Sequence, residues 1–147
     1  MPLVAVTLGV DGSAAQLLQI ERGTEGVIEL RMDGGPLASR AVQTMAQAVR
    51  HLAQDHGVAV TDLAAVIAHG GNGRLPALLA RQLGLPSDRV WSETPQTGNL
   101  GSASLPVAWA ARQPSLPRPV AWAAVGAGLT WAAALTGVVQ AQRGPRP

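Results

Sequence analysis

The 147-residue chain is long enough for one domain with a core of its own, and 47% of its residues are hydrophobic while only 14% are charged. Its net charge of +2 does not indicate a nucleic-acid-binding protein. The absence of Cys excludes a disulfide, a thiolate metal site and a thiol nucleophile within this sequence, and the three histidines lack metal-ligand spacing. Because neither a membrane-spanning apolar run nor a signal-peptide pattern occurs, we expect a soluble, cytoplasmic protein with no membrane partner.

The first part of the chain predicts three strands. Residues 3–6 and 16–20 are the first two, separated by a turn of small residues at 9–13. Residues 22–26 have the composition of a hairpin turn, and residues 27–32 follow as the third strand. We therefore expect these three strands to form an antiparallel run.

A long amphipathic helix is predicted at residues 33–54. Apolar side chains recur every three or four positions on one face, whereas arginines and glutamines occupy the opposite face. The apolar face consists of Leu37, Ala41, Val42, Met45, Val49 and Leu52. Gly57 is the expected stop signal of this helix.

The stretch around His69 organises the middle of the chain. Residues 64–68 are an apolar run that predicts a short buried strand, and His69 stands at its end. A glycine-rich turn follows, and then a helix with Leu75, Leu78, Leu79 and Leu83 on one face. Ligands of open α/β sheets bind outside the carboxyl ends of the strands. His69 is therefore a candidate site residue, although a histidine at a strand end is commonly a capping or core residue.

The segment after the second helix predicts a short strand beginning at Val90 and a polar, glycine-rich turn at residues 97–102 that contains Asn99. The helix expected at residues 103–111 is apolar almost all round. A helix without a polar face must be covered on every side, so this helix predicts a partner for the chain.

The end of the chain predicts a loop marked by Pro114 and Pro117, followed by the last two strands. These strands are expected at residues 120–125 and 129–139, joined at residues 126–128.

Three turns of small residues therefore follow strands, at His69, Asn99 and Gly126. In a βαβ arrangement these turns could converge on one edge of the sheet. A histidine and an asparagine beside flexible backbone amides make a plausible oxyanion site. Each signal alone has a simpler explanation; Gly-Asn, for example, is ordinarily just a turn. Asp11 is likewise expected to form a turn rather than to act as an acid catalyst.

Five motifs, taken together, resemble the β-ketoacyl-acyl-carrier-protein synthase III family of the thiolase superfamily. His69-Gly70-Gly71-Asn72 is similar to the family's His-Gln-Ala-Asn, and Gly98-Asn99 opens a match to its Gly-Asn-Thr-Ser-Ala-Ala-Ser. The other three matches lie at residues 9–15, 32–34 and 126–131. The resemblance runs from about residue 3 to 135 but corresponds to the C-terminal half of the family, so the half with the nucleophilic cysteine is missing.

The resemblance implies an α/β, thiolase-like half-domain at residues 1–138 with a flexible tail at 139–147. Its expected core is a mixed sheet of about five strands with helices on both faces, inside a larger five-layered molecule. The apolar helix at residues 103–111 would then belong to the buried central layer. We expect an obligate dimer, formed with a cysteine-bearing N-terminal half or by self-pairing as a homodimer.

The resemblance also implies roles for particular residues. His69 and Asn99 match the histidine and asparagine of the family's Cys-His-Asn triad, which bind the thioester oxygen while malonyl loses carbon dioxide. The backbone amide of Ala127 matches an oxyanion donor. The motif departures, Gly70-Gly71 for Gln-Ala and Ala127 for glycine, remove no side-chain function.

Gly34 and Asn72 match positions along the family's pantetheine tunnel. Arg74 and Arg81 match basic positions where the acidic acyl carrier protein docks, although a solvated helix face explains these arginines equally well. The implied substrates are thioesters of coenzyme A or acyl carrier protein, with no cofactor and no metal.

Two functions therefore stay open. The first is the C-terminal half of a ketoacyl synthase III type acyltransferase, which joins malonyl and acyl thioesters in fatty acid or polyketide biosynthesis. The second is a non-catalytic binding or scaffold subunit that keeps the thiolase fold.

Overall fold

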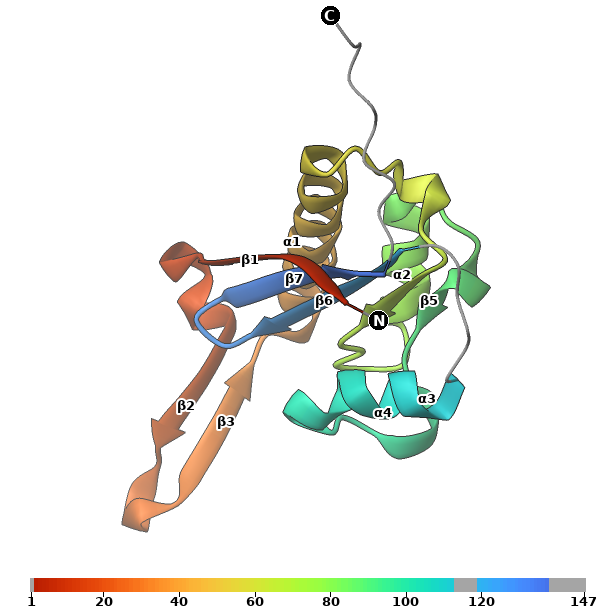
Figure 1. Ribbon diagram of the computed structural model, residues 1–147. Coiled ribbons are helices and arrows are strands. Elements are labelled where there is room, and N and C mark those ends of the chain that lie inside the picture. Colours follow the sequence, from red (N-terminus) through yellow and green to blue (C-terminus); the bar gives the residue numbers. More distant parts are fainter. Residues whose placement is uncertain (1, 113–118, 138–147) are drawn as a thin grey trace, which may run out of the picture.

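A five-stranded mixed sheet forms the centre of the computed structural model, which describes residues 2–112 and 119–137 (Figure 1). Its strands are β1 (Leu3–Val10), β4 (Ala65–Ala68), β5 (Val90–Trp91), β6 (Val120–Gly126) and β7 (Thr130–Thr136). The strand order is β1-β7-β6-β4-β5. β7 is antiparallel to both β1 and β6, whereas β4 is parallel to both β6 and β5. The expected α/β class with a mixed sheet of five strands is confirmed.

Two helices cover one face of this sheet, α1 (Gly34–Asp55) and α2 (Leu75–Leu83). The long helix is confirmed within one residue at each end, and Gly57 follows it with a φ of 66°, the left-handed conformation that commonly ends helices. The shared core includes Met45, Val49, Leu52, Val66, Leu79, Ala123 and Leu135. The predicted apolar face of α2 is wrong at Leu78, which is 40% exposed.

The helix α4 (Ser104–Arg112) lies on the opposite face of the sheet, after the short helix α3 (Thr94–Thr97). Ala108 packs into a second, smaller core cluster with Ile67 and Val120. The centroid of the Trp109 ring lies 5.6 Å from the centroid of the Trp122 ring. Only Ser104 and Ala108 of α4 are buried in the described part of the chain. The other apolar side chains of this helix therefore stay at least partly accessible to a partner.

The face of the sheet beside α4 continues across β6 and β7 to β1. Trp122 of β6 pairs with Ala134 of β7, which pairs with Val6 of β1. Directly paired residues of antiparallel strands point to the same face, so apolar side chains form rows across the three strands. Val6 and Leu8 are 51% and 74% exposed. We call this surface the apolar sheet face; it consists of Val6, Leu8, Trp122, Ala124, Ala132 and Ala134.

The strands β2 (Leu18–Arg22) and β3 (Ile28–Met32) form a separate hairpin that projects from the body of the molecule (Figure 1). The hairpin turn is confirmed, but the expected antiparallel run of three strands is wrong because β1 pairs with β7 instead of β2. The 3₁₀ turns at Gly12–Leu17 separate β1 from β2 along the chain. We call the hairpin formed by β2 and β3 the arm.

The arm is amphipathic. Its apolar side chains pair across the two strands, Leu18 with Met32 and Ile20 with Leu30. The opposite face carries an ion pair between Arg31 Nε and Glu21 Oε2 at 2.9 Å. An isolated two-stranded hairpin is only marginally stable in water, so the apolar side of the arm is a second surface suited to a partner.

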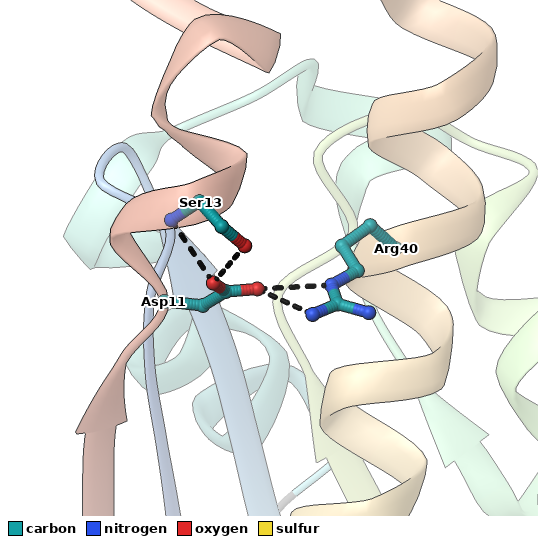
Figure 2. Close-up of polar contacts among 3 residues, drawn as sticks. All are labelled: Asp11, Ser13 and Arg40. Carbon is teal, nitrogen blue, oxygen red and sulfur yellow. Dashed lines mark hydrogen bonds and ion pairs between the residues drawn. The ribbon is translucent and has the colours of Figure 1, made fainter.

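Asp11 anchors the segment between β1 and the arm to α1 (Figure 2). Its Oδ1 accepts a hydrogen bond from the Ser13 backbone N–H at 3.1 Å, and its Oδ2 accepts one from Arg40 Nε at 3.2 Å. The hydrogen bond from the Ser13 side chain, followed by that from Arg40, lowers the pKa of Asp11 below its ordinary value of 3.8. Asp11 is therefore a turn residue, as its small neighbours predict.

The predicted loop at Pro114 and Pro117, the end of the last strand beyond residue 137 and the predicted tail at 139–147 lie outside the described residues. No helix in the described part of the chain has both the length and the apolar character needed to cross a membrane.

Asp11→Asn should lower the free energy of unfolding at neutral pH, because the amide cannot form the ion pair with Arg40. The folded-state pKa of Asp11 lies below the unfolded value, so its stabilising contribution is present above pH 3.8 and is lost as the pH falls below it. Urea unfolding at pH 7 and under acidic conditions measures this difference. Asp55→Asn, the same change at an exposed carboxylate, is the control. A wild-type to Asp11→Asn difference that grows in acid would contradict this account.

Candidate functional site

His69 directly follows β4 and lies at the carboxyl end of two parallel strands. Its backbone N–H donates a hydrogen bond to the carbonyl oxygen of Ala123 at 2.9 Å, which extends the pairing of β4 with β6 by one residue. The His69 side chain is half-buried, and desolvation by this burial lowers its pKa below the ordinary 6.5. This shift favours the neutral imidazole, which carries one N–H donor.

Asn99 lies in an exposed turn between α3 and α4. Its Oδ1 accepts a hydrogen bond from the Gly101 backbone N–H at 2.9 Å, which fixes the side chain in a local turn. With Oδ1 engaged, the side-chain NH2 group of Asn99 is the donor that can serve a ligand. The expectation that this turn follows a strand directly is wrong, because β5 ends at Trp91 and α3 intervenes.

Two adjacent hollows bring the candidate residues together. The inner cavity, about 310 Å³, and the outer groove, about 680 Å³, are both lined by His69, Asn99 and Gly126. Gly34 and Asn72 also line the inner cavity. The outer groove extends over Leu8, Ala124 and Ala132 of the apolar sheet face.

The other three predicted site residues lie outside these two linings. Ala127 is exposed in the turn between β6 and β7, next to Gly126, and its carbonyl oxygen accepts a hydrogen bond from Thr130 Oγ1 at 3.1 Å. Arg74 is exposed at the start of α2. Arg81 lines a different surface hollow between α1 and α2.

Asn72 has a structural role at this site. Its Oδ1 accepts a hydrogen bond from the Arg74 backbone N–H at 2.9 Å, just before α2 begins. This bond closes a local Asx turn in the segment that leads into α2. Any contact of Asn72 with a ligand in the inner cavity would be additional to this role in the turn.

The residue-by-residue reasoning missed the apolar wall of the inner cavity. Leu18, Leu30 and Met32 line it from the base of the arm, and Leu37 and Leu129 line it from α1 and from the turn before β7. The alternation of apolar and polar residues in β2 and β3 was a signal, because it places Leu18, Leu30 and Met32 on one face of the arm. The cavity thus combines an apolar wall with the polar groups of His69 and Asn99.

Within residues 2–112 and 119–137, His, Asp and Glu side chains form no group of three or more that could hold a metal ion. A ligand with an apolar body and a hydrogen-bond acceptor would match the lining of the inner cavity.

Comparison with known proteins agrees with this architecture. Residues 53–138 match the model of the 3-oxoacyl-[acyl-carrier-protein] synthase III C-terminal family. Beta-ketoacyl-[acyl-carrier-protein] synthase III of Rhizorhabdus wittichii is 36% identical over 139 residues, which cover 90% of this chain and 44% of that protein. The chain therefore spans less than half the length of this relative.

Solved structures give the same result. The 3-oxoacyl-(acyl carrier protein) synthase III of Pseudomonas aeruginosa PAO1 superposes with a TM-score of 0.84 at 31% identity, over 95% of this chain and 45% of that one. The priming β-ketosynthase of the R1128 polyketide pathway superposes with a TM-score of 0.78 at 29% identity, over 94% and 46% of the two chains. The family match covers more than half of this chain, so the chain belongs to the 3-oxoacyl-[acyl-carrier-protein] synthase III C-terminal family.

Proposed function

We propose that this chain supplies His69 and Asn99 to a ketoacyl synthase III type acyltransferase, and that a cysteine-bearing N-terminal half supplies the nucleophile. The observation that carries the proposal is that both residues line the same two hollows, although thirty positions separate them in the sequence. Membership of the synthase III family supports the reaction class.

The proposed chemistry divides between the two halves. The partner's cysteine thiolate attacks an acyl thioester, and the original thiol leaves as the acyl group becomes attached to the cysteine. A malonyl thioester then loses carbon dioxide, and the resulting enolate carbon attacks the acyl-cysteine carbonyl. The new carbon–carbon bond gives a β-ketoacyl thioester and returns the thiolate.

His69 and Asn99 would act in the decarboxylation step. Negative charge develops on the thioester oxygen as carbon dioxide leaves, and donors aimed at that oxygen stabilise the transition state more than the ground state. The neutral imidazole of His69 and the side-chain NH2 group of Asn99 are donors of this kind. The Ala127 backbone N–H is proposed as a third oxyanion donor, in the turn beside Gly126.

The apolar sheet face is the proposed seat of the N-terminal half. It combines exposed Val6 and Leu8 with a row of small residues, Ala124, Ala132 and Ala134, that allows the close approach of a helix. The outer groove joins this face to His69 and Asn99, so a cysteine at the end of a helix seated there would reach the same hollow. The apolar side of the arm would extend the contact.

The remaining assignments concern the substrate carrier. Gly34 and Asn72 are proposed to line the path of the phosphopantetheine arm. Their place in the lining of the inner cavity supports this proposal. Arg74 and Arg81 are proposed to bind the acidic surface of an acyl carrier protein, since both are exposed cations on or next to α2.

The accessible apolar surfaces predict that the chain forms a dimer, either with a second copy or with an N-terminal half. Light scattering at micromolar concentration should give a dimer mass, and Leu8→Glu should weaken the dimer because it places a charge in the apolar sheet face. Gln19→Glu, a similar change on the polar side of the arm, is the matched control. A stable, well-folded wild-type monomer would contradict the proposed pairing.

The lowered pKa of His69 predicts a pH dependence of stability. As the pH falls below about 6.5, the unfolded chain takes up the proton first, so the stabilising contribution of neutral His69 is present above this pH and decreases below it. His69→Gln should therefore lose less unfolding free energy than wild type between pH 7 and pH 5. Urea unfolding measures this loss, and an NMR titration midpoint of the His69 ring at or above 6.5 would refute it.

Reconstitution with a cysteine-bearing half should separate catalysis from scaffolding. The chain alone should show no condensation, because its sequence contains no Cys, and at most slow decarboxylation of a malonyl thioester. In an assembly that condenses, His69→Ala should lower kcat about a hundredfold or more, as loss of an oxyanion donor does.

His51→Ala makes the same change at an exposed position on α1 and should leave kcat close to wild type. If His69→Ala and His51→Ala were equally active, the assignment of His69 would be wrong. An assembly that forms but never condenses would instead favour the non-catalytic binding or scaffold subunit.

A further inference from the structure

The turn after His69 and the segment that leads to Asn99 meet at one tightly packed contact. Gly70 is buried, and the position of an added Cβ atom there is occupied by the hydroxyls of Ser92 and Thr94, with the Thr94 Cβ only 2.7 Å away. Gly70 is absent from the positive-φ glycines of the described chain. Glycine is therefore required at this position by the space available and not by the backbone conformation.

The two hydroxyls that fill this space form a small buried network. Ser92 and Thr94 are each only 8% exposed. The Ser92 hydroxyl donates a hydrogen bond to Thr94 Oγ1 at 3.0 Å, and the Thr94 backbone N–H donates one to Ser92 Oγ at 3.3 Å. Buried polar groups that bond each other in this way hold a defined arrangement, because separating them leaves a donor or acceptor without a partner.

A single helical turn connects this contact to Asn99. The Gly98 backbone N–H donates to the Thr94 carbonyl oxygen at 2.9 Å, and Thr97 Oγ1 donates to the Glu93 carbonyl oxygen at 3.0 Å. Asn99 is the next residue after Gly98, just as His69 is the residue before Gly70. The contact between Gly70 and Thr94 therefore joins the two segments that carry the proposed donors.

We propose that Gly70 is a positioning residue, and that its packing against Ser92 and Thr94 sets how His69 and Asn99 lie relative to each other. Its catalytic meaning rests on the proposed function, since the two donors must converge on one substrate oxygen. An added methyl group at residue 70 would push the His69 turn away from α3. A displacement of this kind, of the order of 1 Å, is enough to cost about a hundredfold in rate.

The neighbouring Gly73 provides a matched control. An added Cβ atom at Gly73 would meet its nearest neighbour, Pro95 Cγ, at 3.8 Å, which is ordinary van der Waals contact. Gly73 is likewise absent from the positive-φ glycines of the described chain. Gly70→Ala and Gly73→Ala therefore make the same chemical change in the same turn, and only the former meets occupied space.

NMR of the isotope-labelled full chain tests the proposal without reference to catalysis. Gly70→Ala should shift both the His69 ring signals and the Asn99 side-chain amide signals, whereas Gly73→Ala should leave both in place. The double variant Gly70→Ala/Thr94→Gly should restore them, because the Thr94 side chain is gone and the Ser92 hydroxyl can rotate away. Thr94→Gly alone controls for the loss of that side chain.

The reconstituted assembly supplies the catalytic readout. Gly70→Ala should lower kcat about a hundredfold with little change in KM, because misplaced donors affect the transition state more than substrate binding. The double variant Gly70→Ala/Thr94→Gly should recover most of that loss. If the wild-type assembly does not condense, the proposed function fails, whereas the NMR comparison still decides the role of Gly70.

Two results would overturn the proposal. One is a folded Gly70→Ala chain whose His69 and Asn99 signals match wild type, and the other is a double variant that restores neither signal. If Gly70→Ala does not fold, Ser92→Ala/Thr94→Ala decides, because it removes the hydroxyls beside Gly70. The proposal expects that variant to shift the signals of both His69 and Asn99, and unchanged signals would overturn it.

Discussion

The parallel pairing of β4 with β6 is the constraint on which the candidate site depends. Ala68 pairs with Ala123, and the His69 backbone N–H continues the ladder to the Ala123 carbonyl. Because the two strands run in the same direction, the histidine that follows β4 and the glycine that ends β6 emerge at the same edge of the sheet. All four residues of β4 are buried, so the core on both faces holds this edge in place.

The second constraint is the uneven covering of the sheet. α1 and α2 cover one face, whereas α4 lies against the other beside β4 and the first half of β6 and leaves Val6 and Leu8 accessible. The arm repeats the pattern on a smaller scale, with an apolar face on one side and an ion pair on the other. Both apolar surfaces border the hollows that contain His69 and Asn99, so a partner seated on them would also close the candidate site.

Much of the candidate site followed from local sequence patterns. The apolar run before His69 predicted a buried strand, and the periodicity of residues 33–54 predicted α1 with its buried face. Motif order correctly indicated the family and the half-domain architecture. The turn that contains Asn99 was placed less well, because Thr94–Thr97, with Pro95 as the second residue, form α3 between β5 and the turn. The roles of His69, Asn99, Ala127, Gly34, Asn72, Arg74 and Arg81 stay predictions.

By itself, the sequence determined the elements whose signals are local. These are the amphipathic α1, the buried strand before His69, the hairpin turn of the arm and the largely apolar helix α4. Only the tertiary structure decided that β1 pairs with β7, since pairing between the two ends of a chain depends on contacts that no local pattern encodes. It also decided that Ser92 and Thr94 occupy the space beside Gly70. In the sequence Gly70 is one small residue in a turn, and its steric requirement arises only when a segment more than twenty positions away packs against it.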